Sequence, residues 1–115
     1  MTITELDIPR NLWGSNALLR SDGRMCCLGH LSLACGVSKE EMDNLSYPHS
    51  SWFSVPDWAR NQLVAEAELG SRYASNINDS KALSWREKEP IIINLFKSHG
   101  INLTFSGELD YQGGK

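Results

Sequence analysis

Apolar and polar positions alternate most regularly near the end of the chain, over residues 101–105. An alternation of period two is typical of a half-buried β-strand. Gly100 stands immediately before this stretch, where a helix commonly ends in a left-handed residue. The pattern therefore predicts a strand over 101–105 that follows a helix directly.

A second apolar stretch, residues 25–35, is nearly uninterrupted and is followed by Gly36. Its length and the glycine after it predict a buried helix that ends at that glycine. The short apolar run at 17–20 is closed by a turn signal at Ser21–Gly23, because Asp and Gly tolerate the backbone angles of tight turns. We interpret 17–20 as a short strand.

The segments Ser38–Glu41 and Ser84–Glu87 both match the capping box, in which a serine oxygen and a glutamate three residues later satisfy backbone amides at a helix start. The first predicts a short helix that ends near Leu45. The second predicts a helix that continues to His99, although Pro90 removes one backbone hydrogen bond within it.

The segment after Pro56 has small and apolar residues at steps of three and four, a stripe that favours an amphipathic helix ending near 76–79. The residues of this stripe are Leu63, Ala67, Gly70, Ala74 and Ile77. Residues 1–12 are expected to be an extended lead-in, since Pro9 disfavours a helix before it. The polar, glycine-containing stretch 107–115 is expected to be a mobile tail.

Together these elements predict an α+β fold in one small domain, residues 1–115, with three or four helices packed on a short sheet that contains 101–105 and 17–20. A chain of 115 residues is long enough to bury a core without disulfides or metals. The residues expected in that core are Leu28, Leu31, Leu33, Ile92, Phe96, Leu103 and Phe105.

The net charge of −3 is unevenly distributed, with seven acidic and four basic residues in the first 58 positions. No cluster of Lys and Arg is visible, and a duplex binder needs one to neutralise phosphates. We therefore expect no direct nucleic-acid binding. The chain has no signal-peptide pattern and no apolar run of membrane-spanning length, which predicts a cytoplasmic protein without membrane contact. Three cysteines fit a reducing compartment.

One candidate chemistry lies in the 25–35 helix, where Cys26 and Cys27 precede His30 by four and three residues. That spacing can direct a thiol and an imidazole to one substrate or metal. A zinc site needs about four ligands, commonly in close pairs, and no second close pair exists. The more common role of such residues is packing. We therefore expect no metal, no cofactor and no catalytic residue, with these three residues as the alternative catalytic set.

A second candidate is a binding surface in the serine-rich loop 46–56, since a loop that carries several aromatic residues is either anchored or functional. Trp and Tyr are frequent anchors of protein interfaces, and acidic residues nearby would supply a polar rim. The residues expected to bind a protein are Glu40, Glu41, Asp43, Tyr47, Trp52, Phe53 and Trp58.

Two parts of the sequence resemble a group of small uncharacterised bacteriophage proteins. The first part is Trp13, Leu18-Leu19, Asp22-Gly23-Arg24-Met25-Cys26-Cys27-Leu28-Gly29 and Ala34-Cys35-Gly36; the second is Ile77-Asn78-Asp79, Arg86-Glu87, Leu95-Phe96 and His99-Gly100-Ile101 through Phe105. The Met-Cys-Cys-Leu-Gly segment is the most specific. The resemblance implies a phage origin and action in the host cytoplasm, and it brings no catalytic residues.

The function expected from these observations is that of a phage accessory protein that inhibits a host immune system, for example CRISPR-Cas, by binding a host protein or complex. The alternative is a small cysteine- or metal-dependent enzyme that acts on a host factor or a nucleotide signal. A structural phage component is a third class. Burial distinguishes the first two, because cysteines deep in apolar packing favour a binder and a cleft that exposes a cysteine beside a histidine favours chemistry.

Overall fold

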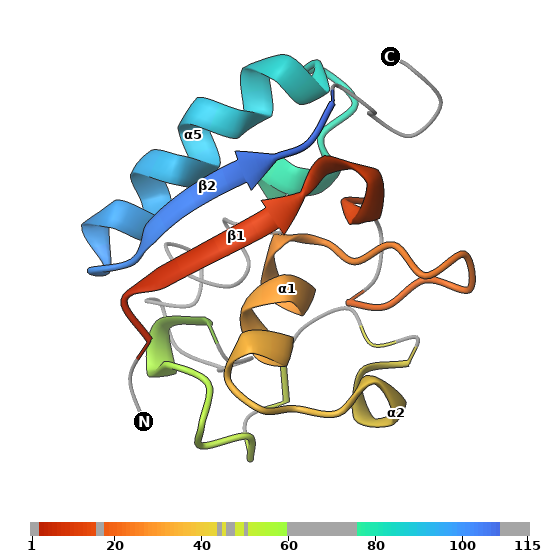
Figure 1. The fold of residues 1–115 in the computed structure, drawn as a ribbon, viewed down its shortest axis with the longest axis vertical. Coiled ribbons are helices and arrows are strands. Elements are labelled where there is room, and N and C mark those ends of the chain that lie inside the picture. Colours follow the sequence, from red (N-terminus) through yellow and green to blue (C-terminus); the bar gives the residue numbers. More distant parts are fainter. Residues whose placement is uncertain are drawn as a thin grey trace.

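A computed structural model of the chain describes residues 3–15, 18–43, 45, 48–49, 51–59 and 76–108. The fold is α+β: a small two-stranded parallel sheet packs against helices (Figure 1). Strand β1 is Glu5–Pro9 and strand β2 is Asn102–Ser106. Helix α5, Trp85–Ser98, runs along β2, and helix α1, Cys27–Ala34, packs against β1.

The sheet joins the first and last described segments of the chain. Glu5 lies opposite Asn102, and the pairing continues in register to Pro9 opposite Ser106. The Asn102 amide donates to the Thr4 carbonyl at 2.8 Å and sets that register. The strand predicted over 101–105 is therefore present, shifted by one residue, and its partner is the lead-in expected to be extended.

Strand β1 has alternating apolar and acidic residues. Leu6 and Ile8 are buried while Glu5 and Asp7 are exposed, which is the pattern of a strand with one apolar face. The strand ends at Pro9, and a single 3-10 turn, η1 at Arg10–Leu12, follows it. The prediction had no helical turn in this lead-in.

The predicted strand at 17–20 is wrong. Among its described residues, Leu19 makes only an isolated bridge to Asp43, outside the sheet. The neighbouring Leu18 is fully buried against α1, where its carbonyl oxygen would lie 2.1 Å from a Cβ atom built on Gly29. The apolar run at Leu18-Leu19 therefore serves the contact with α1, which periodicity cannot distinguish from strand pairing.

Helix α1 begins two residues later than predicted, with Cys26 in the extended N-cap position, and ends at Ala34. Cys35 is its C-cap, and Gly36 follows with a φ of +98°. Only glycine adopts this left-handed conformation without a steric penalty, so the predicted terminator is confirmed.

Both predicted capping boxes are present. Ser38 accepts a hydrogen bond from the Glu41 amide at the start of α2, Lys39–Met42. Ser84 accepts one from the Glu87 amide at the start of α5. The second box also lowers the pKa of Glu87, because the Ser84 amide and hydroxyl donate to its carboxylate. Helix α5 continues through Pro90. The proline has no amide to donate to the carbonyl four residues earlier, but Pro90 is exposed, so water can bind that carbonyl instead.

The core lies between the sheet, α1 and α5. Its buried apolar residues are Leu6, Ile8, Trp13, Leu18, Met25, Cys26, Cys27, Leu28, Leu31, Val37, Met42, Val55, Ala59, Ile92, Phe96, Ile101 and Leu103. Most predicted core residues are among them, and Phe105 packs against them half-buried. Leu33 is wrongly predicted, because it is 38% exposed near the C-terminal end of α1.

The remaining described elements are η2, Asp57–Ala59, and a helical segment at residues 76–79. The latter matches the predicted end of the helix after Pro56, but most of its stripe, residues 63–74, lies outside the described residues. So does the predicted tail beyond residue 108. Within the ranges that the structure describes, no helix has the length and apolar character needed to cross a membrane.

Candidate functional site

The three residues of the alternative catalytic set lie in the interior of the protein. Cys26 and Cys27 are buried, and His30 is 5% exposed. Burial raises the pKa of Cys26 to about 12 and raises that of Cys27 well above its usual value. Cys26 stands at the start of α1, but desolvation outweighs any stabilisation of a thiolate by the helix. Both side chains are therefore neutral thiols at physiological pH.

The imidazole of His30 has a structural partner. Its Nε2 atom lies 3.0 Å from the carbonyl oxygen of Leu12, which ties α1 to the end of η1. Burial lowers the pKa of His30, so the ring is neutral near pH 7 and donates to this carbonyl. In the described part of the chain, no group of three or more His, Cys, Asp or Glu side chains is placed to hold a metal ion.

The lowered pKa of His30 predicts that acid destabilises the protein. Between the folded-state pKa and the unfolded value of 6.5, the unfolded chain binds one more proton. Stability is therefore fully present above pH 6.5 and falls as the pH decreases toward the folded-state pKa, by at most about 1.4 kcal/mol per pH unit. Urea unfolding between about pH 7.5 and about pH 5.5 measures this.

The matched variants are His30→Gln, whose amide can still donate to the Leu12 carbonyl, and His99→Gln. Partial burial also lowers the pKa of His99, but this residue is far more exposed than His30. We expect His30→Gln to flatten the pH dependence of the unfolding free energy and His99→Gln to change it less. The interpretation is wrong if the His30→Gln profile keeps the wild-type slope.

The candidate binding loop presents one large apolar side chain to solvent. Phe53 is 81% exposed, the highest exposure among the large hydrophobic residues that the structure describes. Trp52 beside it is half-buried and packs against the core. The two side chains thus differ in exposure, and the more exposed one is Phe53.

Around Phe53 the backbone is held on both sides. The Trp52 amide donates to the His49 carbonyl at 3.1 Å, and the Val55 amide donates to the Trp52 carbonyl at 2.9 Å. Val55 and Pro48 are buried and fix the loop to the core. Phe53 is therefore displayed from an anchored turn.

Trp58 differs from the expected role of a surface anchor. Its ring stacks on His99 with the centroids 4.2 Å apart and the planes 4° from parallel. It also meets Phe96 edge-on at 5.2 Å. These contacts attach η2 to the C-terminal end of α5, so Trp58 positions the loop that carries Phe53.

The acidic residues of α2 are exposed, as expected for a polar rim. The carboxylate of Glu41 accepts from the Ser38 hydroxyl at 3.0 Å within the capping box, so its geometry is fixed locally. In the view of Figure 1, α2 and the 51–59 segment lie on either side of the C-terminal end of α1. Tyr47 lies outside the described part of the chain.

Sequence reasoning missed a buried polar centre at Asn78. Asn78 is fully buried. Its Oδ1 atom accepts from the Trp13 indole at 2.7 Å and from the Cys27 amide at 3.1 Å. Its Nδ2 atom donates to the Gly14 carbonyl at 2.9 Å and to Asp79 Oδ1 at 3.0 Å. One side chain thus connects three segments, and no local pattern in the sequence indicates it.

Lys88 completes this centre from α5. Its Nζ atom donates to the Asn78 carbonyl at 2.7 Å and lies 3.8 Å from the centroid of the Trp85 ring. Burial lowers the pKa of Lys88, and the charge of Asp79 opposes that effect. These contacts use the ammonium group for packing.

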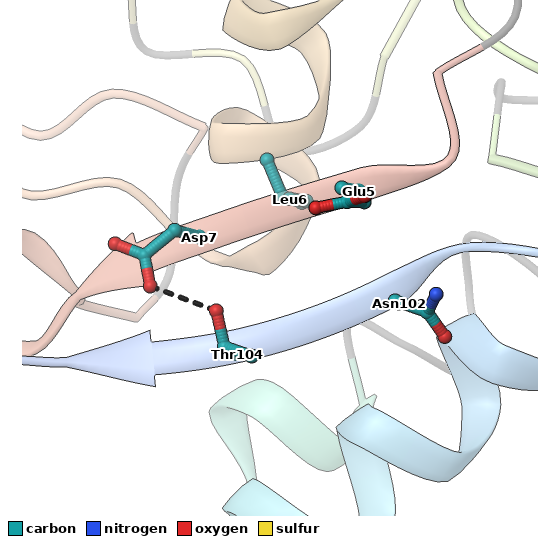
Figure 2. A pocket seen from close by; sticks show the side chains of 5 residues that line it. All are labelled: Glu5, Leu6, Asp7, Asn102 and Thr104. Carbon is teal, nitrogen blue, oxygen red and sulfur yellow. Dashed lines mark hydrogen bonds between the residues drawn. The ribbon is translucent and has the colours of Figure 1, made fainter.

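A shallow hollow lies on the outer face of the sheet, lined by Glu5, Leu6, Asp7, Asn102 and Thr104, with a volume of about 370 Å³ (Figure 2). Asp7 Oδ1 accepts from the Thr104 hydroxyl at 2.9 Å. Leu6 points away from the other four side chains toward α1. The hollow therefore has a polar, acidic surface with a fixed carboxylate at one side.

Compared with known proteins, the chain matches no protein-family model, no curated protein and no solved structure.

Proposed function

We propose that this protein is a phage-encoded accessory protein that inhibits a host immune system, for example CRISPR-Cas, by binding a host protein stoichiometrically in the host cytoplasm. The phage origin and the immune target rest on the sequence resemblance described above. The binding mode rests on one structural observation: Phe53 is exposed on an anchored turn.

An exposed aromatic residue on a fixed loop is suited to protein recognition. Aromatic residues are enriched at the centres of protein interfaces, where their large apolar surface is buried by the partner. Because Val55 and Pro48 anchor the turn, little conformational entropy is lost when Phe53 enters a partner's pocket. Phe53 is therefore the anchor residue of the proposed interface, with the half-buried Trp52 beside it.

The net negative charge of the first 58 residues, which include Phe53, favours a basic partner. Glu40 and Asp43 are exposed on and after α2, and the first 58 residues carry three more acidic than basic groups, seven against four. Proteins that handle nucleic acid have basic surfaces. Complementary charge would speed association and make it sensitive to salt.

The thiol-enzyme alternative is less well supported. A cysteine nucleophile needs a thiolate that a substrate can reach. Cys26 and Cys27 are buried and their pKa values are raised. The imidazole of His30 is directed to a backbone carbonyl. These observations favour binding over chemistry as the activity.

The test is a binding assay with a Phe53→Ala variant. Tagged wild-type protein is used to capture its partner from lysate of a host with an active immune system, and the partner is then purified and titrated. We expect Phe53→Ala to weaken binding by about 2 kcal/mol, which is roughly thirtyfold in Kd. The same variant should lose its ability to protect phage or plasmid from interference.

Leu12→Ala is the matched control, because Leu12 is also an exposed apolar residue, at 41%, in a different part of the fold. It should bind as the wild type does. The proposal fails if Phe53→Ala binds and inhibits normally. It also fails if a correctly folded Cys26→Ala variant loses inhibition, since that result would indicate thiol chemistry.

A further inference from the structure

Among the residues that the structure describes, the outer edge of β1 has no hydrogen-bonded neighbour. In a parallel ladder, alternate residues direct their N–H and C=O groups to the same neighbour. Glu5 lies opposite Asn102, and the Asn102 amide donates to the Thr4 carbonyl. This register directs the backbone N–H and C=O groups of Leu6 and Ile8 toward β2. Glu5 and Asp7 therefore direct their backbone groups to the opposite edge. In the described part of the chain, no hydrogen bond joins that edge to another segment.

The outer face of the sheet is also uncovered. Parallel sheets usually have both faces buried, yet Glu5, Asp7, Asn102 and Thr104 are exposed here. Figure 2 shows these side chains around the hollow described above. Asp7 is held in place, because the hydroxyls of Thr104 and Ser106 donate to its two carboxylate oxygens at 2.9 and 2.6 Å.

From this geometry we infer that the edge of β1 binds an extended, basic segment of a partner protein by strand addition. The partner's backbone would pair with Glu5 and Asp7, and its Lys or Arg side chains on the outer face would lie beside the two carboxylates. Such backbone pairing supplies affinity, while side chains at alternate positions supply specificity. The inference concerns a second surface and does not rest on the interface around Phe53.

Charge determines the choice of occupant. In a second copy of this chain, β1 added to β1 would bring Glu5 and Asp7 close to their own counterparts, and like charges on facing strands are destabilising. A basic segment gains an attraction at each of these positions instead. The hollow of about 370 Å³ leaves room for a long cationic side chain across the sheet face. Pro9 has no amide and limits the paired region to the first part of β1.

The test uses a synthetic probe, the capped heptapeptide Thr-Lys-Val-Lys-Val-Lys-Thr. It is titrated into isotope-labelled protein and followed by amide NMR and hydrogen exchange. We expect shifts and slower exchange at the amides of Glu5 and Asp7. A peptide with the same sequence but N-methylated at alternate amides should not bind, because it cannot complete the backbone ladder. A peptide with Glu in place of Lys should bind poorly.

Glu5→Lys is the informative variant, since Glu5 is exposed and we expect its replacement to leave the fold intact. It should weaken binding of the lysine peptide about tenfold, because an attraction becomes a repulsion, and improve binding of the glutamate peptide. Glu40→Lys makes the same charge change on α2 and should leave both affinities unchanged.

Three results would overturn the inference: absence of lysine-peptide binding at millimolar concentration, equal binding of the N-methylated peptide, or equal weakening by Glu40→Lys. The last would indicate only a general attraction of cations to an acidic protein. None of these results bears on the Phe53 interface, which has its own partner assay.

Discussion

Gly29→Ala is expected to destabilise the protein severely, although alanine is the better helix former by about 1 kcal/mol. A Cβ atom at position 29 would lie 2.1 Å from the Leu18 carbonyl oxygen and 3.0 Å from Met25 Cβ. The Leu18 backbone cannot easily retreat, because its amide donates to the Leu45 carbonyl at 2.7 Å. We expect a loss of about 3 kcal/mol or more in the free energy of unfolding.

Thermal unfolding followed by circular dichroism measures this effect as a decrease in Tm of roughly 10 °C. Gly100→Ala is the matched control: Gly100 has a φ of +83° and nothing within 4 Å of a built Cβ atom. That change has only the backbone penalty of about 1–2 kcal/mol. If the two variants lose the same stability, close approach of α1 to Leu18 is not the reason that position 29 is glycine.

Removing the side chain of Asn78 is the second change with a large expected effect. Asn78→Leu keeps the branched shape of the side chain but removes four hydrogen bonds at once. Each buried polar group that loses a partner costs about 1–3 kcal/mol. We expect a total loss of about 3–5 kcal/mol in urea unfolding, since the partners share one network and their contributions are not additive.

Asn94→Leu is the control for this prediction, because Asn94 is exposed on α5. It should change stability by less than about 0.5 kcal/mol. The quenching and wavelength of tryptophan emission provide a second readout, since the Trp13 indole loses its bond to Asn78. An Asn78→Leu variant with wild-type stability and emission would contradict the role assigned to this side chain.

The sequence was most informative where a few neighbouring residues determine the structure. The two capping boxes and the glycine terminators at Gly36 and Gly100 involve residues within one helical turn of each other, and all are present. The strand after Gly100 was likewise predictable from the alternation of its own residues. These features depend on backbone hydrogen bonds and φ angles that neighbouring side chains control directly.

Pairing between distant segments was not predictable in the same way. β1 and β2 are about 97 residues apart, at Asp7 and Thr104, and nothing in either segment identifies the other. The strand at 17–20 was wrongly assigned because Leu18 and Leu19 are apolar for packing against α1. Leu33 was placed in the core because α1 is apolar nearly all round, so its sequence does not indicate which side faces solvent.

For the candidate site, residue type identified the loop but not the orientation of its side chains. The stacking of Trp58 on His99 depends on a contact across 41 residues, from position 58 to position 99. The burial of Cys26 and Cys27 likewise depends on the whole fold. Asn78 was missed because a buried asparagine has the same local sequence as a capping one.

The pairing of β1 with β2 also has a consequence for synthesis of the protein. On the ribosome, Asp7 emerges 97 residues before Thr104, which at about 5–20 residues per second is a delay of roughly 5 to 20 s. During that time β1 has no strand to pair with. Its two carboxylates and its terminal proline then act as protection, because charges and proline at a strand edge discourage pairing with other nascent chains. The sheet is completed only when residues 102–106 leave the exit tunnel, so its closure is among the last steps of folding.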